Sequence, residues 1–151
     1  MHRVGWGICL LLAAAGAAAA GEVLVDGQPA ELEVVDGDSV RVGGQEWRVI
    51  GYDTAEIERA ACEGERRLGL IARRRLGQLI GGAQRVALTG SGERDRHRRP
   101  LGRLLIDGRD AGDIMVAEDL ARPYNGGRKK GWCSRDSRDD LVPGPQPARR
   151  R

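Results

Sequence analysis

The 151-residue chain is poor in aromatic side chains, which make up 3% of it and include no Phe. Modules that hold single-stranded nucleic acid without cutting it stack bases on aromatic rings, so this scarcity argues against a purely binding role. Histidine is scarce too: only His2 and His97 occur. A hydrolase that needs several histidines is therefore disfavoured. The net charge of +3 is too small to indicate a nucleic-acid partner by itself.

Only one long apolar run occurs, from Val4 to Ala15, after a short basic start. Small residues follow up to Ala20, so residues 1–20 are predicted to be a secretory signal peptide cleaved after Ala20. The expected location is secreted or periplasmic, with no stable membrane association after cleavage. The alternative is a chain anchored in the membrane by an uncleaved leader. We expect one domain over 21–133 and a disordered basic, Pro-containing tail over 134–151.

Cysteine is rare, and removal of the leader would leave two, Cys62 and Cys133. In an oxidising compartment such a pair favours one disulfide. Closing so long a loop would stabilise the fold by about 4 kcal/mol. The alternative is two buried thiols.

The order of periodic segments predicts the fold class. Strand signals cover 22–25, 32–42, 45–50, 85–89 and 101–106, and a helical period covers 63–80, with a second helix after Asp110. Five short strands with a helix after the third favour an α+β, mainly β architecture: a five-stranded OB-fold barrel with two or three helices.

Glycines set the expected strand pairing near the start of the domain. We interpret 32–42 as one strand bent at residues 36–38, followed by a two-residue turn at Gly43-Gly44. That turn would pair Val42 with Gln45 and Ser39 with Arg48. A bulge or irregular turn would then be needed to bring Asp38 to the side of Arg48.

Apolar spacing predicts which helix faces are buried. In the first helix, one face carries Leu68, Ala72, Leu76, Leu79 and Ile80. In the second, Asp110 is a candidate N-cap, and Ile114, Ala117 and Ala121 are expected to face inward.

Six charged residues in three segments carry the chemistry. They are Asp36, Asp38, Arg48, Asp53, Glu56 and Arg99. Carboxylates hold hard divalent cations, guanidinium groups bind phosphate, and a spare carboxylate can accept a proton from water. Each segment alone has a plainer interpretation as a turn, a helix start or a solvated charge cluster. Together they indicate a metal-dependent phosphodiesterase.

Three ordered motifs resemble the staphylococcal-nuclease-like (thermonuclease) family over about residues 22–132. They are Val34-Val-Asp-Gly-Asp-Ser-Val40, Arg48-x4-Asp53-Thr54-x-Glu56 and Asp95-Arg-His-Arg-Arg99. The resemblance implies an OB fold and a Ca2+-dependent endonuclease that hydrolyses DNA and RNA to 3′-phosphate products.

The resemblance also implies a role for each matching residue. Asp38, Asp53 and the Thr54 carbonyl would bind Ca2+, Glu56 would act as general base, and Asp36 would support them. Arg48 and Arg99 would stabilise the scissile phosphate, while Arg96, His97 and Tyr124 would contact substrate. The expected substrate is DNA or RNA, preferably single-stranded, cleaved by a monomer. The alternative is a catalytically silent OB-fold module that binds single-stranded nucleic acid.

Two departures from the family pattern bear on the site. Ala55 replaces the usual proline before Glu56, which loosens the turn that presents this carboxylate. His97-Arg98 replaces the usual Tyr-Gly, which leaves open whether Arg98 or Arg99 points into the site.

Overall fold

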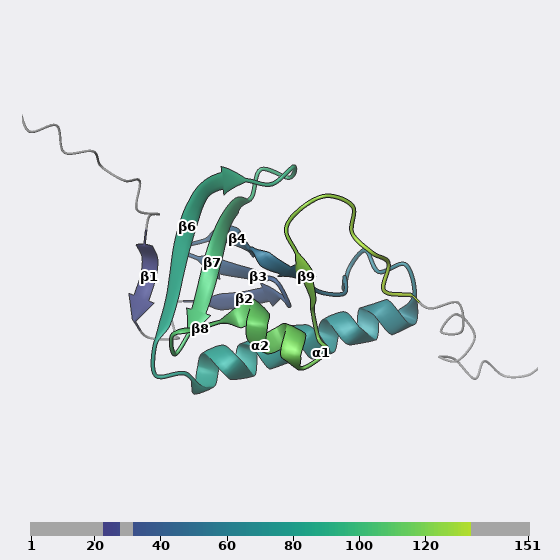
Figure 1. Ribbon diagram of the computed structural model, residues 1–151, viewed down its shortest axis with the longest axis horizontal. Helices are drawn as coiled ribbons and strands as arrows, with labels where there is room; N and C mark the ends of the chain where they lie inside the picture. The colour runs from purple at the N-terminus through teal and green to yellow at the C-terminus, as the bar shows by residue number, and fades with distance from the viewer. Residues whose placement is uncertain (1–22, 28–31, 134–151) are drawn as a thin grey trace, which may run out of the picture.

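The computed structural model describes residues 23–27 and 32–133 (Figure 1). The expected signal peptide and the expected tail lie outside the described residues. Within those residues, neither helix combines the length and apolarity needed to cross a membrane.

A curled, half-barrel sheet forms the centre of a mixed α+β fold (Figure 1). Six strands follow the order β1-β6-β7-β4-β3-β2, and the short β8 pairs with β7. The bounds are β1 Val23–Gly27, β2 Glu33–Asp36, β3 Ser39–Val42, β4 Gln45–Val49, β6 Val86–Arg94, β7 Pro100–Ile106 and β8 Arg109–Asp110. The sheet has the expected barrel-like curvature, whereas a closed five-stranded barrel stays a prediction.

Two helices and a small second sheet complete the described fold. Helix α1 spans Glu63–Gly82 and α2 spans Ala111–Ala117, while β5 (Gly51–Asp53) pairs with β9 (Arg122–Tyr124). Asp110 caps α2 as expected, because its side chain accepts a hydrogen bond from the Gly112 amide.

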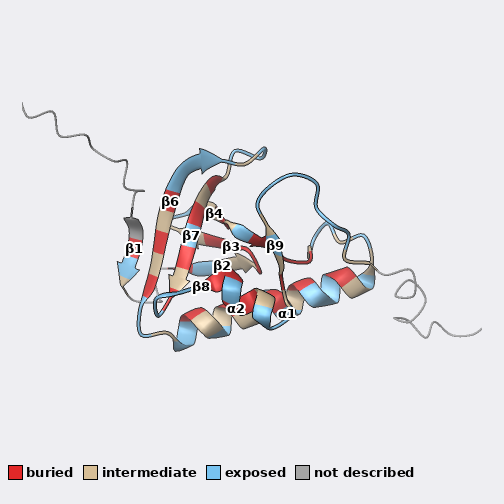
Figure 2. Ribbon diagram, viewed as in Figure 1, coloured by how far each residue is buried: buried red, intermediate tan, exposed pale blue. Residues whose placement is uncertain are grey.

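The core lies between the sheet and the helices, as the buried segments in Figure 2 show. Of the inner face predicted for α1, Ala72, Leu76 and Ile80 are buried and Leu79 is half-buried. The prediction for Leu68 was wrong: its exposed fraction is 37%. Here α1 turns Glu65 and Gly69 inward instead.

The predicted inner face of α2 also needs one correction. Ala117, which was expected to face inward, is exposed, whereas Ile114 and Ala121 are buried as predicted. Met115 is buried as well, so the short helix buries neighbouring residues 114 and 115 near its centre and leaves its last residue in solvent.

The single bent strand predicted over 32–42 is a hairpin. Strands β2 and β3 pair antiparallel, with Val34 opposite Val40 and Asp36 opposite Ser39. The reversal falls at Asp36-Gly37, two residue types that favour turns, and the Asp36 carboxylate accepts a hydrogen bond from the Gly37 amide at 2.7 Å. This reversal, with a register shift between Val34 and Asp36, resolves the alternation problem at Asp38. The predicted pairing of Val42 with Gln45 and Ser39 with Arg48 is confirmed.

A disulfide joins Cys62 and Cys133, 71 positions apart, which confirms the predicted pairing. Cys62 is also the N-cap of α1, where its sulfur accepts a hydrogen bond from the Glu65 amide. The bond therefore ties the end of the described chain to the beginning of α1.

Gly69 lets α1 approach the backbone that carries Glu56. A Cβ at this position would lie 2.7 Å from the Ala55 carbonyl oxygen and 2.9 Å from that of Glu56. Gly69→Ala should therefore lower the free energy of unfolding by about 1–3 kcal/mol. Gly77→Ala is the matched control, because nothing lies within 4 Å of its Cβ.

The control should raise the free energy of unfolding by about 0.5–1 kcal/mol, since alanine favours a helix over glycine. Urea denaturation of both variants measures the difference. Equal effects of the same sign would contradict the close packing of α1 on residues 55–56.

Candidate active site

A buried ion network links the first two sequence motifs. The side chain of Arg48 pairs with Asp38, and its Nη2 lies 3.2 Å from Asp53 Oδ1. The exposed fractions of these three residues are only 7%, 5% and 4%. Burial lowers the pKa of the Arg48 guanidinium, against the raising effect of nearby Asp53. The guanidinium is thus an internal cation between two carboxylates.

Backbone contacts fix the geometry around this network. The Thr54 amide donates to Asp38 Oδ2 at 3.1 Å, and the Val49 amide donates to the Asp38 carbonyl at 2.9 Å. Tyr52 is fully buried, and its hydroxyl donates to the Gly37 carbonyl at 3.1 Å. Burial raises the pKa of Tyr52 above its ordinary value, so this donor stays neutral. The hairpin turn and β5 are therefore held together beside Arg48.

Parallel pairing of β4 with β7 brings the third motif to the same place. Arg48 lies opposite Leu101, two residues beyond Arg99. The turn before Arg99 is closed by Asp95, whose carboxylate accepts hydrogen bonds from the amides of His97 and Arg99. Segments that are far apart in the sequence thus meet at the ends of neighbouring strands.

Arg99, not Arg98, points to the site. Its guanidinium contacts Asp95 at 2.8 Å, Glu46 at 3.0 Å and Ser39 at 3.3 Å. Burial opposes the charge on Arg99, but Glu46 and Asp95 hold its pKa above the ordinary value. Arg98 is exposed, with a φ of 67°. The two carboxylates therefore orient the Arg99 guanidinium while part of it stays open to solvent.

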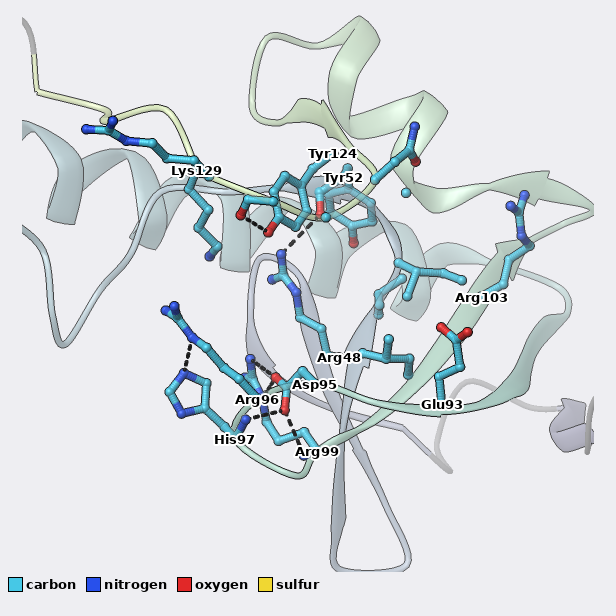
Figure 3. Close-up of a pocket in the computed structure, with 18 of the residues that line it drawn as sticks. Arg48, Tyr52, Glu93, Asp95, Arg96, His97, Arg99, Arg103, Tyr124 and Lys129 are labelled. Atoms are coloured by element: carbon cyan, nitrogen blue, oxygen red, sulfur yellow. Dashed lines mark hydrogen bonds and ion pairs between the residues drawn. The ribbon is translucent and has the colours of Figure 1, made fainter.

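A cleft of about 730 Å³ opens beside the ion network. Figure 3 shows Arg48 at its centre, with the Asp95–Arg99 turn on one side and Tyr124 and Lys129 on the other. Cationic side chains outnumber acidic ones in the lining: Arg48, Arg59, Arg96, Arg99, Arg103, Arg128 and Lys129 against Glu56, Glu93 and Asp95. Such a lining attracts anions.

The remaining predicted site residues fall into two groups. Glu56, Arg96, His97 and Tyr124 line the cleft, and the Arg96 side chain donates to the ring of His97 at 3.1 Å. Asp36, Asp38, Asp53 and Thr54 do not line it: Asp36 is the last residue of β2, and the other three are buried. Burial raises the pKa of Asp36, with Glu56 adding to the effect. The supporting role expected for Asp36 stays a prediction.

Two residues that the motifs did not reveal complete the network. The Lys129 ammonium lies 2.7 Å from Asp53 Oδ1 and 3.1 Å from Glu56 Oε1. The Trp132 indole N–H donates to Asp53 Oδ2 at 3.4 Å. Both residues are more than 70 positions from their partners in the sequence. The predicted disulfide at Cys133 fixes the end of this segment at the start of α1, and no sequence signal placed Lys129 or Trp132 near Asp53.

The donor set suits a hard divalent cation in its chemistry. Asp38, Asp53 and Glu56 supply carboxylate oxygens, which calcium prefers. Their spacing is that of a salt-bridge network, because Arg48 and Lys129 lie between them. In the described part of the chain, the only group of three potential ligand atoms within 4.8 Å of one another is Cys62, Glu65 and Cys133, and its sulfurs form the disulfide. Calcium binding would thus require both Arg48 and Lys129 to move away from the carboxylate oxygens that they contact.

No protein-family model matches the chain, and a search of curated proteins finds no significant match. The interpretation of the site therefore rests on its motifs and its geometry.

Proposed function

We propose that the protein is a calcium-dependent phosphodiesterase that cleaves DNA and RNA within an OB-type fold. One observation carries the proposal: Arg48 and Glu56 of the second motif and Arg99 of the third line one cation-rich cleft, and Arg48 is ion-paired with Asp38 of the first motif and with Asp53. Protein packing does not by itself require such a set. The curled sheet supports the OB-type assignment, and the disulfide supports an oxidising, secreted or periplasmic location.

The cleft residues have distinct tasks in this reaction. The Arg48 and Arg99 guanidiniums bind the phosphate oxygens and stabilise the charge that grows on them in the transition state. Asp95 and Glu46 hold Arg99 in orientation, so little reorganisation is needed during the reaction. Asp38, Asp53 and the Thr54 carbonyl would hold calcium, which would supply further positive charge to stabilise the phosphate.

Glu56 is the proton acceptor in this scheme. It lines the cleft and is only half-buried, so a water molecule can reach its carboxylate. The carboxylate accepts the proton as that water attacks phosphorus and the bond to the 5′ oxygen breaks. Arg96, His97 and Tyr124 lie along the same cleft, where they contact the nucleotides beside the scissile bond.

Cleavage of single-stranded DNA with calcium or with chelator tests the proposal. We expect the purified mature protein to cut a labelled oligonucleotide into 3′-phosphate fragments in calcium and to leave it intact in chelator. If the protein is instead a catalytically silent OB-fold module that binds single-stranded nucleic acid, it will bind the oligonucleotide without cutting it in both conditions. Filter binding, run beside the cleavage gel, measures this outcome. Binding without cleavage would refute the nuclease and favour the binding module.

A further inference from the structure

Residues 125–133 form a strap that runs from β9 back to α1 (Figure 1). Its residues 125–129 line the cleft. The strap ends at Cys133, which is bonded to Cys62 at the N-cap of α1. Two residues of β9 brace it. The Arg122 guanidinium lies 3.8 Å from the centre of the Trp132 ring and donates to the Gly131 carbonyl at 3.0 Å, and the Tyr124 hydroxyl donates to the Gly127 carbonyl at 2.8 Å. The strap is thus held at both ends.

The strap carries Lys129 to the carboxylates proposed to bind calcium. The ammonium contacts Asp53 and Glu56 together, at 2.7 Å and 3.1 Å. It therefore lies where the two carboxylates offer oxygen atoms to a cation. The side chain of Lys129 keeps 36% of its surface exposed, whereas that of Asp53 keeps 6%. The ammonium can consequently withdraw into the cleft without breaking buried packing.

We propose that Lys129 is an intramolecular competitor of the divalent cation, held at Asp53 and Glu56 by the disulfide-closed strap. This rests on the proposed function in one respect only, that these carboxylates bind calcium. While the ammonium is in place, calcium meets a satisfied pair of carboxylates. The apparent affinity for calcium is reduced by the fraction of time that the carboxylates are free. Lys129 therefore raises the calcium concentration at which the site fills, beyond the effect of Arg48, which pairs with Asp38 and Asp53 with or without the ammonium.

A merely structural lysine would behave differently. Its loss would weaken the fold and leave Asp53 less well positioned, so calcium affinity would fall or stay the same. A competitor predicts the opposite sign: removal of the ammonium should strengthen calcium binding. The direction of the change in affinity separates these two roles.

The experiment compares Lys129→Met with Lys130→Met by calorimetric titration of calcium into the full mature protein. Lys130 is the matched control, because its loss changes the net charge equally and it makes no ion pair among the described residues. We expect calcium affinity to rise about tenfold in Lys129→Met. This is the gain expected if the ammonium occupies the two carboxylates about nine-tenths of the time in the wild type. Lys130→Met should stay close to wild type.

Terbium luminescence gives a second readout that does not depend on activity. The Trp132 indole lies within hydrogen-bond distance of Asp53, so it can sensitise terbium bound there. Terbium should fill the site at a lower concentration in Lys129→Met than in wild type. Unchanged or weaker binding of both ions in Lys129→Met, or an equal gain in Lys130→Met, overturns the proposal.

The role of the tether is tested by replacing Cys62 and Cys133 with serine, at a temperature where circular dichroism shows a folded protein. Without the disulfide, the strap no longer holds Lys129 against the carboxylates, so calcium affinity should rise. Adding Lys129→Met to the double-serine variant should raise calcium affinity little further. Fully additive effects would overturn the role of the disulfide.

Cleavage assays on the same samples separate this proposal from the proposed function. If Lys129→Met binds calcium more tightly but no variant cleaves DNA, the proposed nuclease activity is refuted, whereas the competition between Lys129 and calcium is supported. If cleavage depends on calcium but wild type and Lys129→Met bind calcium equally well, the nuclease activity is supported and the competition by Lys129 is refuted.

Discussion

Arg48→Met is expected to lower the free energy of unfolding by about 4 kcal/mol in the absence of calcium. Arg48 is the cation shared by Asp38 and Asp53, whose side chains keep only 7% and 6% of their surface exposed. Among the described residues, its removal would leave Asp38 with hydrogen-bond donors but no positive partner, and Asp53 with Lys129 and the Trp132 indole N–H. Breaking a buried ion pair from one side is costly because the remaining charge stays desolvated.

Urea denaturation in chelator measures this loss, and Arg41→Met is its control. Arg41 pairs with Glu33 on the surface, where the side-chain exposed fractions are 34% and 66%. Loss of that pair should cost less than about 1 kcal/mol. Calcium should restore part of the stability of Arg48→Met, because a cation that binds the folded state stabilises it. A loss as small as that of the control would mean that the network does not support the fold.

Glu56→Gln is expected to slow cleavage about a thousandfold, within the range typical of a lost general base. The amide keeps the size and hydrogen-bonding shape of the side chain but cannot accept the proton of the attacking water. Glu56 is half-buried and lines the cleft, so the substitution leaves no buried group unpaired. Stability should therefore change little while turnover falls.

Glu58→Gln controls for the change in charge. Glu58 is exposed and lies two residues away, outside the lining of the cleft. Its substitution should leave turnover close to wild type. Single-turnover cleavage of one oligonucleotide by both variants, at saturating calcium, gives the comparison. If both variants slowed cleavage equally, general electrostatics rather than proton transfer would explain the effect.

Local rules predicted the parts of the site that are close in sequence. The two glycines at 43–44 set the pairing of Ser39 with Arg48, because a two-residue turn defines the register of its hairpin. The cap at Asp110 followed equally from local chemistry. The hairpin at Asp36 was missed although Asp36-Gly37 is itself a turn signal, because the strand signals at 32–35 and 39–42 were interpreted as one bent strand.

Non-local contacts account for what the sequence could not predict. Parallel pairing of β4 with β7 decides that Arg99 meets Arg48, and no turn signal encodes it. Packing decides that Gly69 rather than Leu68 faces inward, since a side chain there would collide with the Ala55 carbonyl. Lys129 lies 73 positions from Glu56 and belongs to no motif, so only the folded chain reveals their contact.

The most direct test of the central claim is one cleavage assay with four combinations: wild type and Glu56→Gln, each with calcium and with chelator. If three distant segments form a calcium-dependent phosphodiesterase, only wild type in calcium will fragment single-stranded DNA at an appreciable rate. Fragmentation by wild type in chelator, or by Glu56→Gln at the wild-type rate in calcium, would contradict it.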